Sequence, residues 1–460
     1  MNDEQAFLAL DIGSVKIAAV IGKKKDSEDD LPQIYGHGIS ASNGLKKGII
    51  TNIEEASKSI QKAVLDASRI AGMNVNKATV SISSAYTKGL TSNGIVNIID
   101  GEISINEIKR AIDTAMYNAN VMLNEYKVIH ALPYMFKVDE HEGIEDPIGM
   151  NGSRLEAFVY IVTVQKSALN NLEKVIKNAG ITVKNFVLDG YATSLSVVNK
   201  DEKSLGVATI NMGGSVCNLS ISLGNTICYN STLPIGSYNI TKDISITAQT
   251  NIQAAEEAKL EYASLILEDS NKTLELPALG DSTKKHSISI NIINQITYAR
   301  VEETLMLLKK MLENSGFKDD IGAGVILTGG MTKLQGMREV ASKIFDTQSI
   351  RIAKPNGGFM EELNDESYST VIGLILYASG QYTKYEIDSN KILRYTNKTI
   401  ATENHLQEVD SSAHDENSIG NLLVSDDKDK NGNMNGLKDD LKIINQPQSS
   451  KLSNWLKDLF

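Results

Sequence analysis

Two glycine turns, each joining a pair of apolar strand-like runs, constrain the fold of this chain more than any other feature. The first hairpin consists of Phe7–Leu10, the turn DIGS at residues 11–14, and Val15–Ile21. The second consists of VATIN, MGGS and VCNLSIS, at residues 207–211, 212–215 and 216–222. The apolar periodicity of Ile53–Ala71 predicts an amphipathic helix after the first hairpin. The two hairpins are roughly 200 residues apart and each leads on to helical stretches, a pattern that predicts two related α/β lobes.

A third glycine turn, Gly324–Leu334, follows a short buried strand and runs toward a helical stretch at Met337–Ile344. Glycine between buried strands often serves only as a turn, and each of the three turns has that simpler explanation. The alternative is anion binding, because glycine lets backbone N–H groups approach phosphate oxygens closely. Ser14 or Ser215 would add a hydroxyl donor. Two facing turns could hold a polyphosphate, and the third could lie flat against a purine and its ribose.

The overall composition excludes several classes of protein. The 460 residues carry a net charge of -11 and no basic stripe with interleaved aromatics, which argues against nucleic-acid binding. Two cysteines, Cys217 and Cys228, cannot form a disulfide framework. The first residues are acidic where a signal peptide is basic, and no run of 18 apolar residues occurs. We therefore expect a cytosolic chain without a membrane span.

Five segments together resemble the actin and sugar-kinase superfamily. DIGSVKIA, NMGGSVCNLS and GVILTGGMTKLQGM occur in the order and spacing of its phosphate-1, phosphate-2 and adenosine motifs. FVLDGYATS and STVIGLILYA look like its two inter-lobe connecting helices. Within that superfamily, Val80–Thr163 resembles the subdomain that the FtsA family of bacterial cell-division proteins inserts into its first lobe. The resemblance implies a two-lobed actin-like α/β fold with such an insert.

The residues of the insert themselves predict a compact α/β unit. We expect strands at Val80–Ile82, Val128–Leu132 and Phe158–Val164, a helix at Ile105–Asn120, and a polar turn around Asp146–Gly149. In the FtsA family the insert contacts neighbouring subunits of a filament, so the resemblance implies self-association into filaments.

The resemblance also implies a division of the chain into subdomains. The first-lobe core would comprise residues 1–79, 165–203 and 368–394, with the insert at 80–164. The second-lobe core would comprise residues 204–236 and 317–367, with a helical subdomain at 237–316. A disordered acidic linker at 395–450 and an amphipathic membrane-targeting helix at 451–460 would follow.

By position within the motifs, the resemblance assigns a nucleotide site. The residues implied to bind ATP are Gly13, Ser14, Lys16, Gly213, Gly214, Ser215, Glu256, Lys259, Gly329, Gly330 and Met331. Asp11 and Asp189 would order the waters around Mg²⁺. Glu256 and Lys259 could instead be an i,i+3 ion pair on a solvated helix face. Arg300 and Glu303 lie on the helix before the adenosine strand.

The second turn departs from the family pattern at two positions. Where the family usually has aspartates, this chain has Asn211 and Asn218. An amide accepts a hydrogen bond but cannot act as a base or supply charge to a metal. The catalytic set would then be Asp11, Asp189 and a degenerate Asn211. We expect Mg·ATP binding with weak or no hydrolysis.

The last sixty residues have a different composition from the rest. Residues 401–450 hold ten acidic residues against four lysines and show no sustained periodicity, which is typical of a disordered linker. In KLSNWLKDLF, five apolar residues fall on one helical face: Leu452, Trp455, Leu456, Leu459 and Phe460. The helix could pack on the protein body, but insertion at a membrane interface fits a helix that follows a long polar linker.

Together these features favour an ATP-binding, filament-forming adaptor. By the family resemblance it would tether the FtsZ ring, through the C-terminal tail of FtsZ, to the inner face of the cytoplasmic membrane at the division site. It would also recruit later division proteins. Two alternatives remain at this point: a diverged FtsA paralogue that anchors another membrane machinery, and a soluble actin-like kinase or ATPase.

Overall fold

The computed structural model describes residues 6–24, 31–119, 125–267, 272–347, 349–357 and 360–395. These residues belong to one compact unit, which ends at Thr396. The predicted helix at 451–460 and all but the first residue of the predicted linker at 395–450 lie outside the described residues. No helix among the described residues is long and apolar enough to cross a membrane.

The first sheet is built around the first glycine-turn hairpin. Its order is β11-β6-β1-β2-β3, with β1 (Ala6–Ile12), β2 (Lys16–Lys23), β3 (Gln33–Ala41), β6 (Lys77–Ile82) and β11 (Thr182–Leu188). Helix α1, Ile53–Ala71 as predicted, packs against β2 and β3. A Cβ on Gly38 of β3 would lie 2.0 Å from the Ala63 carbonyl oxygen of α1. Glycine on β3 therefore permits the close approach of helix and sheet.

The second sheet repeats this arrangement. Its order is β14-β13-β12-β17-β18, with β12 (Val207–Met212), β13 (Cys217–Leu223), β14 (Thr226–Leu233), β17 (Val325–Thr328) and β18 (Ile350–Ile352). In both sheets an antiparallel three-strand meander is extended by two parallel strands. This duplication confirms the prediction of two related α/β lobes.

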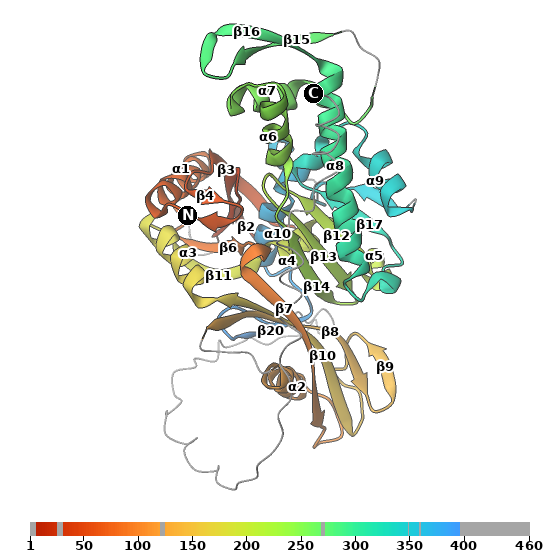
Figure 1. Cartoon of the computed structure of the whole chain (residues 1–460). Helices are drawn as coiled ribbons and strands as arrows, with labels where there is room; N and C mark the ends of the chain where they lie inside the picture. Colours follow the sequence, from red (N-terminus) through yellow and green to blue (C-terminus); the bar gives the residue numbers. More distant parts are fainter. Residues whose placement is uncertain are drawn as a thin grey trace, which may run out of the picture. The chain divides into compact units, whose positions relative to one another are not determined.

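Two buried helices lie between the sheets (Figure 1). They are α4 (Asp189–Val197) and α10 (Ser369–Ala378), at the positions of the two predicted connecting helices. Helix α10 contacts β1 of the first sheet, whereas α4 contacts β12 and β13 of the second. A Cβ on Gly373 of α10 would lie 1.7 Å from the Ala192 carbonyl oxygen of α4. The two helices therefore cross with their backbones nearly in contact.

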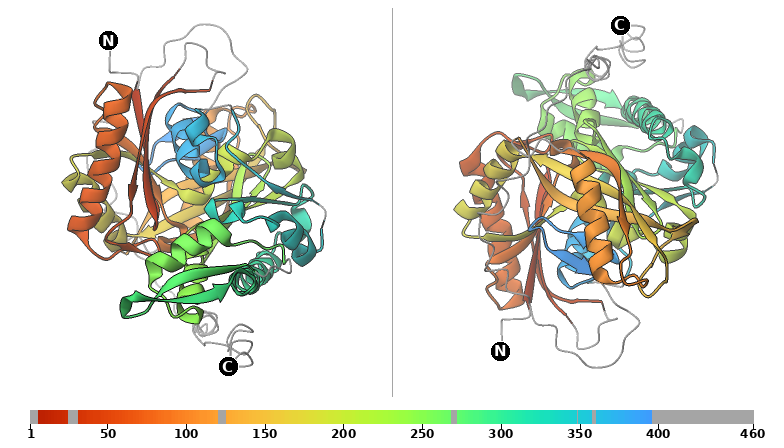
Figure 2. Two further views of the ribbon diagram at one scale, coloured as in Figure 1. Left: turned by 90° about the horizontal axis from the view of Figure 1, so that it is seen from above. Right: turned by 90° about the horizontal axis from the view of Figure 1, so that it is seen from below.

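The insert forms a third sheet with one helix across it (Figure 2, right). The sheet has the order β20-β19-β8-β10-β7, and β9 pairs with β8. Its elements within the insert are β7 (Thr87–Asn97), α2 (Ile105–Asn118), β8 (Tyr126–Val138), β9 (His141–Ile144) and β10 (Arg154–Gln165). A capping box formed by Ser104 and Glu107 begins α2.

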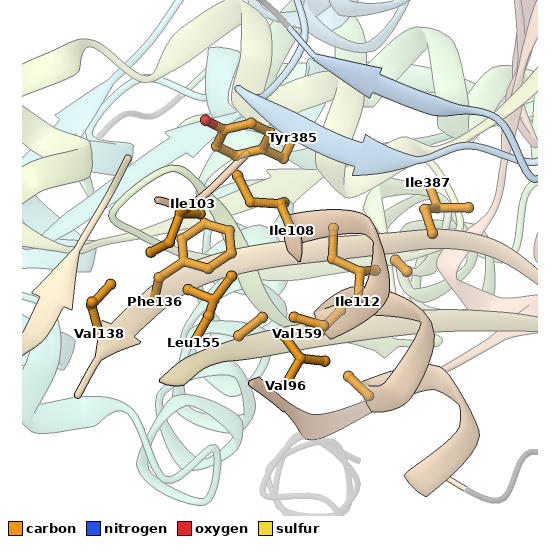
Figure 3. Packing of buried hydrophobic residues seen from close by; sticks show 14 of the residues in the cluster. Val96, Ile103, Ile108, Ile112, Phe136, Val138, Leu155, Val159, Tyr385 and Ile387 are labelled. Carbon is orange, nitrogen blue, oxygen red and sulfur yellow. The ribbon is translucent and has the colours of Figure 1, made fainter. Parts of the chain in front are cut away.

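Two features of the insert differ from the sequence expectation. The run Val80–Ile82 lies in β6, which pairs in parallel with β1 and β11, so this strand belongs to the first sheet. Two late strands, β19 (Tyr385–Ile387) and β20 (Leu393–Tyr395), join the sheet of the insert, although they fall in a range expected in the first-lobe core. Tyr385 packs into the core of the insert beside Phe136 and Ile108, and Ile387 belongs to the same core (Figure 3).

The segment 237–316, expected to be helical, also contains a two-stranded sheet. It comprises α6 (Ser237–Thr247), α7 (Ile252–Tyr262), β15 (Thr273–Ala278), β16 (Asp281–Ser289) and α8 (Ile290–Glu313). The remaining α-helices and strands among the described residues are β4 (Leu45–Lys46), β5 (Ile49–Ile50), α3 (Lys166–Asn178), α5 (Lys200–Leu205) and α9 (Met337–Phe345).

Candidate functional site

A cavity of about 460 Å³ lies where the three glycine turns meet. It is lined by residues of both lobes, including β1 and β2 on one side and β12 and α7 on the other. The cavity is lined by every residue that the sequence predicts for the nucleotide, the metal or catalysis. These residues are Asp11, Gly13, Ser14, Lys16, Asp189, Asn211, Gly213, Gly214, Ser215, Glu256, Lys259, Gly329, Gly330 and Met331. Residues as far apart in the sequence as Asp11 and Met331 are thus brought to one site.

The two hairpin turns face each other across this cavity. A Cβ on Gly214 would lie 2.1 Å from Cγ2 of Val15, so the second turn can approach the first only with glycine at this position. The second turn is also tied to the start of α6. The backbone N–H groups of Ser237 and Tyr238 donate to the carbonyls of Gly213 and Gly214, at 3.0 and 2.7 Å.

Lys16 extends from β2 toward the segment before α10. Its ammonium donates to Oγ of Ser367 at 2.8 Å and lies 3.5 Å from the ring centroid of Tyr368. Burial lowers the pKa of Lys16 to about 8, while the nearby carboxylates of Asp11 and Asp365 oppose that shift. Lys16 is thus a cation in the cavity wall whose described contacts include neutral oxygen and aromatic groups, which suits an anionic ligand.

Two carboxylates lie at the base of the cavity. Asp11 accepts a 2.8 Å hydrogen bond from Ser81. Asp189, at the start of α4, is 8% exposed and accepts hydrogen bonds from the Ser84 backbone and hydroxyl and from the Gly190 N–H. Burial raises the pKa of both groups, to about 6 for Asp189. A bound cation would favour their ionised forms.

The side-chain amides of Asn211 and Asn218 both act as hydrogen-bond donors. The Asn218 amide donates to Asp189 at 2.8 Å and accepts from Thr232 at 2.9 Å. The Asn211 amide donates to the hydroxyls of Thr193 and Thr370, at 3.2 and 3.0 Å. An aspartate at position 218 would place a second carboxylate against Asp189, and the two negative charges would repel each other. The Asn218 amide avoids this repulsion.

The Glu256–Lys259 pair combines features of both sequence interpretations. The two side chains form the i,i+3 ion pair at 2.8 Å. The helix face is not solvated at Lys259, however, because this side chain is 8% exposed and also donates to the Thr241 hydroxyl at 3.0 Å. Both residues line the cavity. Arg300 and Glu303 do not line it, because Arg300 pairs with Asp243 and Glu303 instead.

The third turn closes the cavity from the second lobe. Gly329 has φ +93°, in the region that favours glycine, and a Cβ there would lie 2.4 Å from Oδ1 of Asn211. Several lining residues were not predicted from the sequence, among them Ser81, Lys333, Ser367 and Thr370. Ser367 and Thr370 could have been sought in the polar segment directly before the apolar run of α10.

Sequence comparisons identify the family. Cell division protein FtsA of Helicobacter pylori strain J99 is 36% identical over 429 residues, which cover 86% of this chain and 86% of that protein. The protein of the same name from Pseudomonas aeruginosa is 34% identical over 375 residues, covering 81% and 88%. The chain belongs to the FtsA family. A profile for cell division protein FtsA matches residues 208–373, and a profile for the SHS2 domain inserted in FtsA matches residues 84–163.

Solved structures identify the fold of this FtsA-family chain. The PilM-PilN type IV pilus biogenesis complex aligns with a TM-score of 0.58 and 15% identity, covering 81% of this chain and 98% of that one. MreB5 of Spiroplasma citri bound to ADP aligns with a TM-score of 0.51 and 13% identity, covering 82% and 97%. The chain therefore has a mixed α/β actin-like fold. Its SHS2 match begins at residue 84, just after β6, in agreement with the strand pairing.

Proposed function

We propose that this FtsA-family protein binds Mg·ATP between its lobes, forms filaments, and tethers the FtsZ ring to the inner face of the cytoplasmic membrane. The observation that carries the proposal is the cavity between the two duplicated hairpin turns, in a chain of this family. The turns, Lys16 and the two buried carboxylates supply the groups that a polyphosphate and its cation need.

The residues that line the cavity suit a nucleotide in three ways. Gly13, Ser14, Lys16, Gly213, Gly214 and Ser215 would hold the phosphates, and Gly329, Gly330, Met331, Glu256 and Lys259 would contact the adenosine. Asp11 and Asp189 would hold Mg²⁺ through its waters, and the ion would supply charge that neutralises the phosphates. MreB5 of Spiroplasma citri, which shares the fold, has been solved with both ADP and AMPPNP.

We expect binding without efficient hydrolysis. Asn211 and Asn218 are amides held in place as hydrogen-bond donors, so neither can accept a proton from an attacking water. Asp11 and Asp189 remain, and burial raises the pKa of both. The nucleotide would then act mainly by closing the lobes and favouring subunit association.

The remaining steps of the proposal rest on family membership and on the C-terminal sequence. The insert would contact neighbouring subunits of the filament, a surface of the second lobe would bind the C-terminal tail of FtsZ, and later division proteins would be recruited to the assembly. The apolar face of residues 451–460 would insert into the membrane interface. One helix should bind weakly, whereas many helices on one filament bind tightly through their high effective concentration. The protein would therefore be a peripheral membrane protein at the division site.

A flotation assay with liposomes, Mg·ATP and FtsZ tests this proposal. Wild-type protein should float with the vesicles and carry FtsZ with it. Trp455→Glu should stay in the soluble fraction, because it places a charge at the apolar boundary. Asn454→Glu, on the other face of the predicted helix, is the matched control and should float. Flotation of Trp455→Glu at the wild-type level would contradict membrane attachment by this helix.

Recovery of FtsZ separates the main proposal from its closest alternative. A diverged FtsA paralogue that anchors another machinery should float with ATP but leave FtsZ behind. The two amides in the second turn are the feature that favours this alternative. Floating protein without FtsZ would support it.

A further inference from the structure

Three lysines line the cavity, and they differ in how firmly they are held. Lys259 is buried and its ammonium contacts Glu256, the Thr241 hydroxyl and the Ser237 carbonyl. Lys16 is held by Ser367 and Tyr368. The Lys333 side chain is 48% exposed and forms an ion pair with Asp365, its carboxylate partner among the described residues. Lys333 is therefore the cation most able to change partners.

Asp365 lies at a junction between the two lobes. It precedes the short 3-10 helix η6 (Glu366–Tyr368), and its Oδ1 accepts from the Ser367 N–H at 2.8 Å and the Ser367 hydroxyl at 2.6 Å. That hydroxyl accepts in turn from Lys16 of the first lobe, whereas Oδ2 of Asp365 faces Lys333 of the second. One carboxylate thus connects a lysine of each lobe at the cavity wall.

The two charges of this pair also act at the expected phosphate site. Asp365 favours the charged form of Lys16, and Lys333 disfavours it, so both lie within electrostatic range of the Lys16 ammonium. An anionic ligand beside Lys16 would consequently attract Lys333 and repel Asp365.

We propose that Asp365 is an internal counter-ion that holds Lys333 at the cavity wall, and that a nucleotide's phosphates compete with it for Lys333. The pair would then set how strongly the site prefers nucleotides with more phosphates. This inference rests on the proposed nucleotide function and adds a positioning residue to it. The exchange is favourable for a polyphosphate because a half-exposed ion pair is weak, whereas attraction by the ligand grows with its charge.

Asp365→Asn tests the idea with little change in shape. The asparagine keeps an oxygen to accept from Ser367 and loses the charge that restrains Lys333. By calorimetry, affinity for Mg·ATP should rise about fivefold, the factor for the upper range of a surface ion pair. The gain should be smaller for ADP and absent for adenosine. A purely structural role for Asp365 would change all three ligands alike.

A double-mutant cycle gives a second readout. Lys333→Gln should weaken ATP binding, Lys333→Arg should restore it, and Asp365→Asn should have a clearly smaller effect once Lys333 is replaced, because Asp365 acts mainly through Lys333. Glu361→Gln and Lys343→Gln alter exposed charges nearby in sequence that do not line the cavity, and they should bind ATP like the wild type. Thermal denaturation of each variant confirms that it is folded.

Three results would count against the inference. These are an unchanged ATP affinity in Asp365→Asn, an equal change for ATP and adenosine, and an additive double mutant. If the proposed nucleotide function itself is wrong, calorimetry gives a different result, because the wild-type protein would then bind no adenine nucleotide.

Discussion

Replacing Asp189 by asparagine should change the free energy of unfolding, relative to the wild type, by an amount that grows as pH rises from about 4.5 to about 7. Asp189 is 8% exposed, and burial raises its pKa from the ordinary value of 3.8 to about 6. The carboxylate accepts hydrogen bonds from Ser84, Gly190 and Asn218, but these only partly offset the loss of water. Its ionised form is therefore costly in the folded protein.

The sign and size of the effect follow from linkage between ionisation and folding. In the unfolded chain Asp189 loses its proton near pH 4, whereas in the folded protein it loses it near pH 6. The free energy of unfolding therefore falls as pH rises between these values and is level above them. The total loss is about 3 kcal/mol, of which about 2 kcal/mol falls between pH 4.5 and pH 7.

Urea denaturation without nucleotide and with a chelator, repeated from pH 4.5 to 8, measures this effect. The difference in unfolding free energy between Asp189→Asn and wild type should grow by about 2 kcal/mol from pH 4.5 to pH 7 and then remain constant. Any fixed cost of fitting the new amide shifts the whole curve without altering its slope. A difference that is independent of pH would refute the reasoning. The same variant should bind Mg·ATP more weakly, because a carboxylate near the cation is lost.

Three further predictions concern two glycines in close contacts and the amide of Asn211. Gly373→Ala should lower the free energy of unfolding by about 2 to 3 kcal/mol in urea denaturation, because its Cβ would lie 1.7 Å from the Ala192 carbonyl oxygen. Gly89→Ala should destabilise the insert, since its Cβ would lie 1.7 Å from the hydroxyl of Tyr160; limited proteolysis would detect this change. Phosphate-release assays should show wild-type turnover far below about 1 per second and a gain in Asn211→Asp; turnover typical of active ATPases would contradict the assigned role of the amides.

The elements that could be predicted from the sequence are those with local signals. Helix α1 has the residue range expected from its apolar periodicity, and both hairpins follow from apolar runs around glycine turns. The cavity residues in those turns were predicted because their motifs are contiguous. The pattern within one segment is thus enough to predict an element or site residue when that segment alone determines it.

The remaining features depend on pairings between distant segments. The resemblance places the run Val80–Ile82 in the insert, but its apolar character fits any buried strand, and only the pairing of β6 with β1 and β11 decides its sheet. Strand β7 was not predicted because only two of its eleven residues are buried. Ser367 contacts Lys16 across 351 residues, which no local pattern reveals.

Calorimetry of the full chain with Mg·ATP tests the central claim most directly. The account predicts one binding site per chain and a large loss of affinity in Lys16→Gln, with no loss in Lys343→Gln. Absence of ATP binding by the wild-type protein, or unchanged affinity in Lys16→Gln, would contradict it.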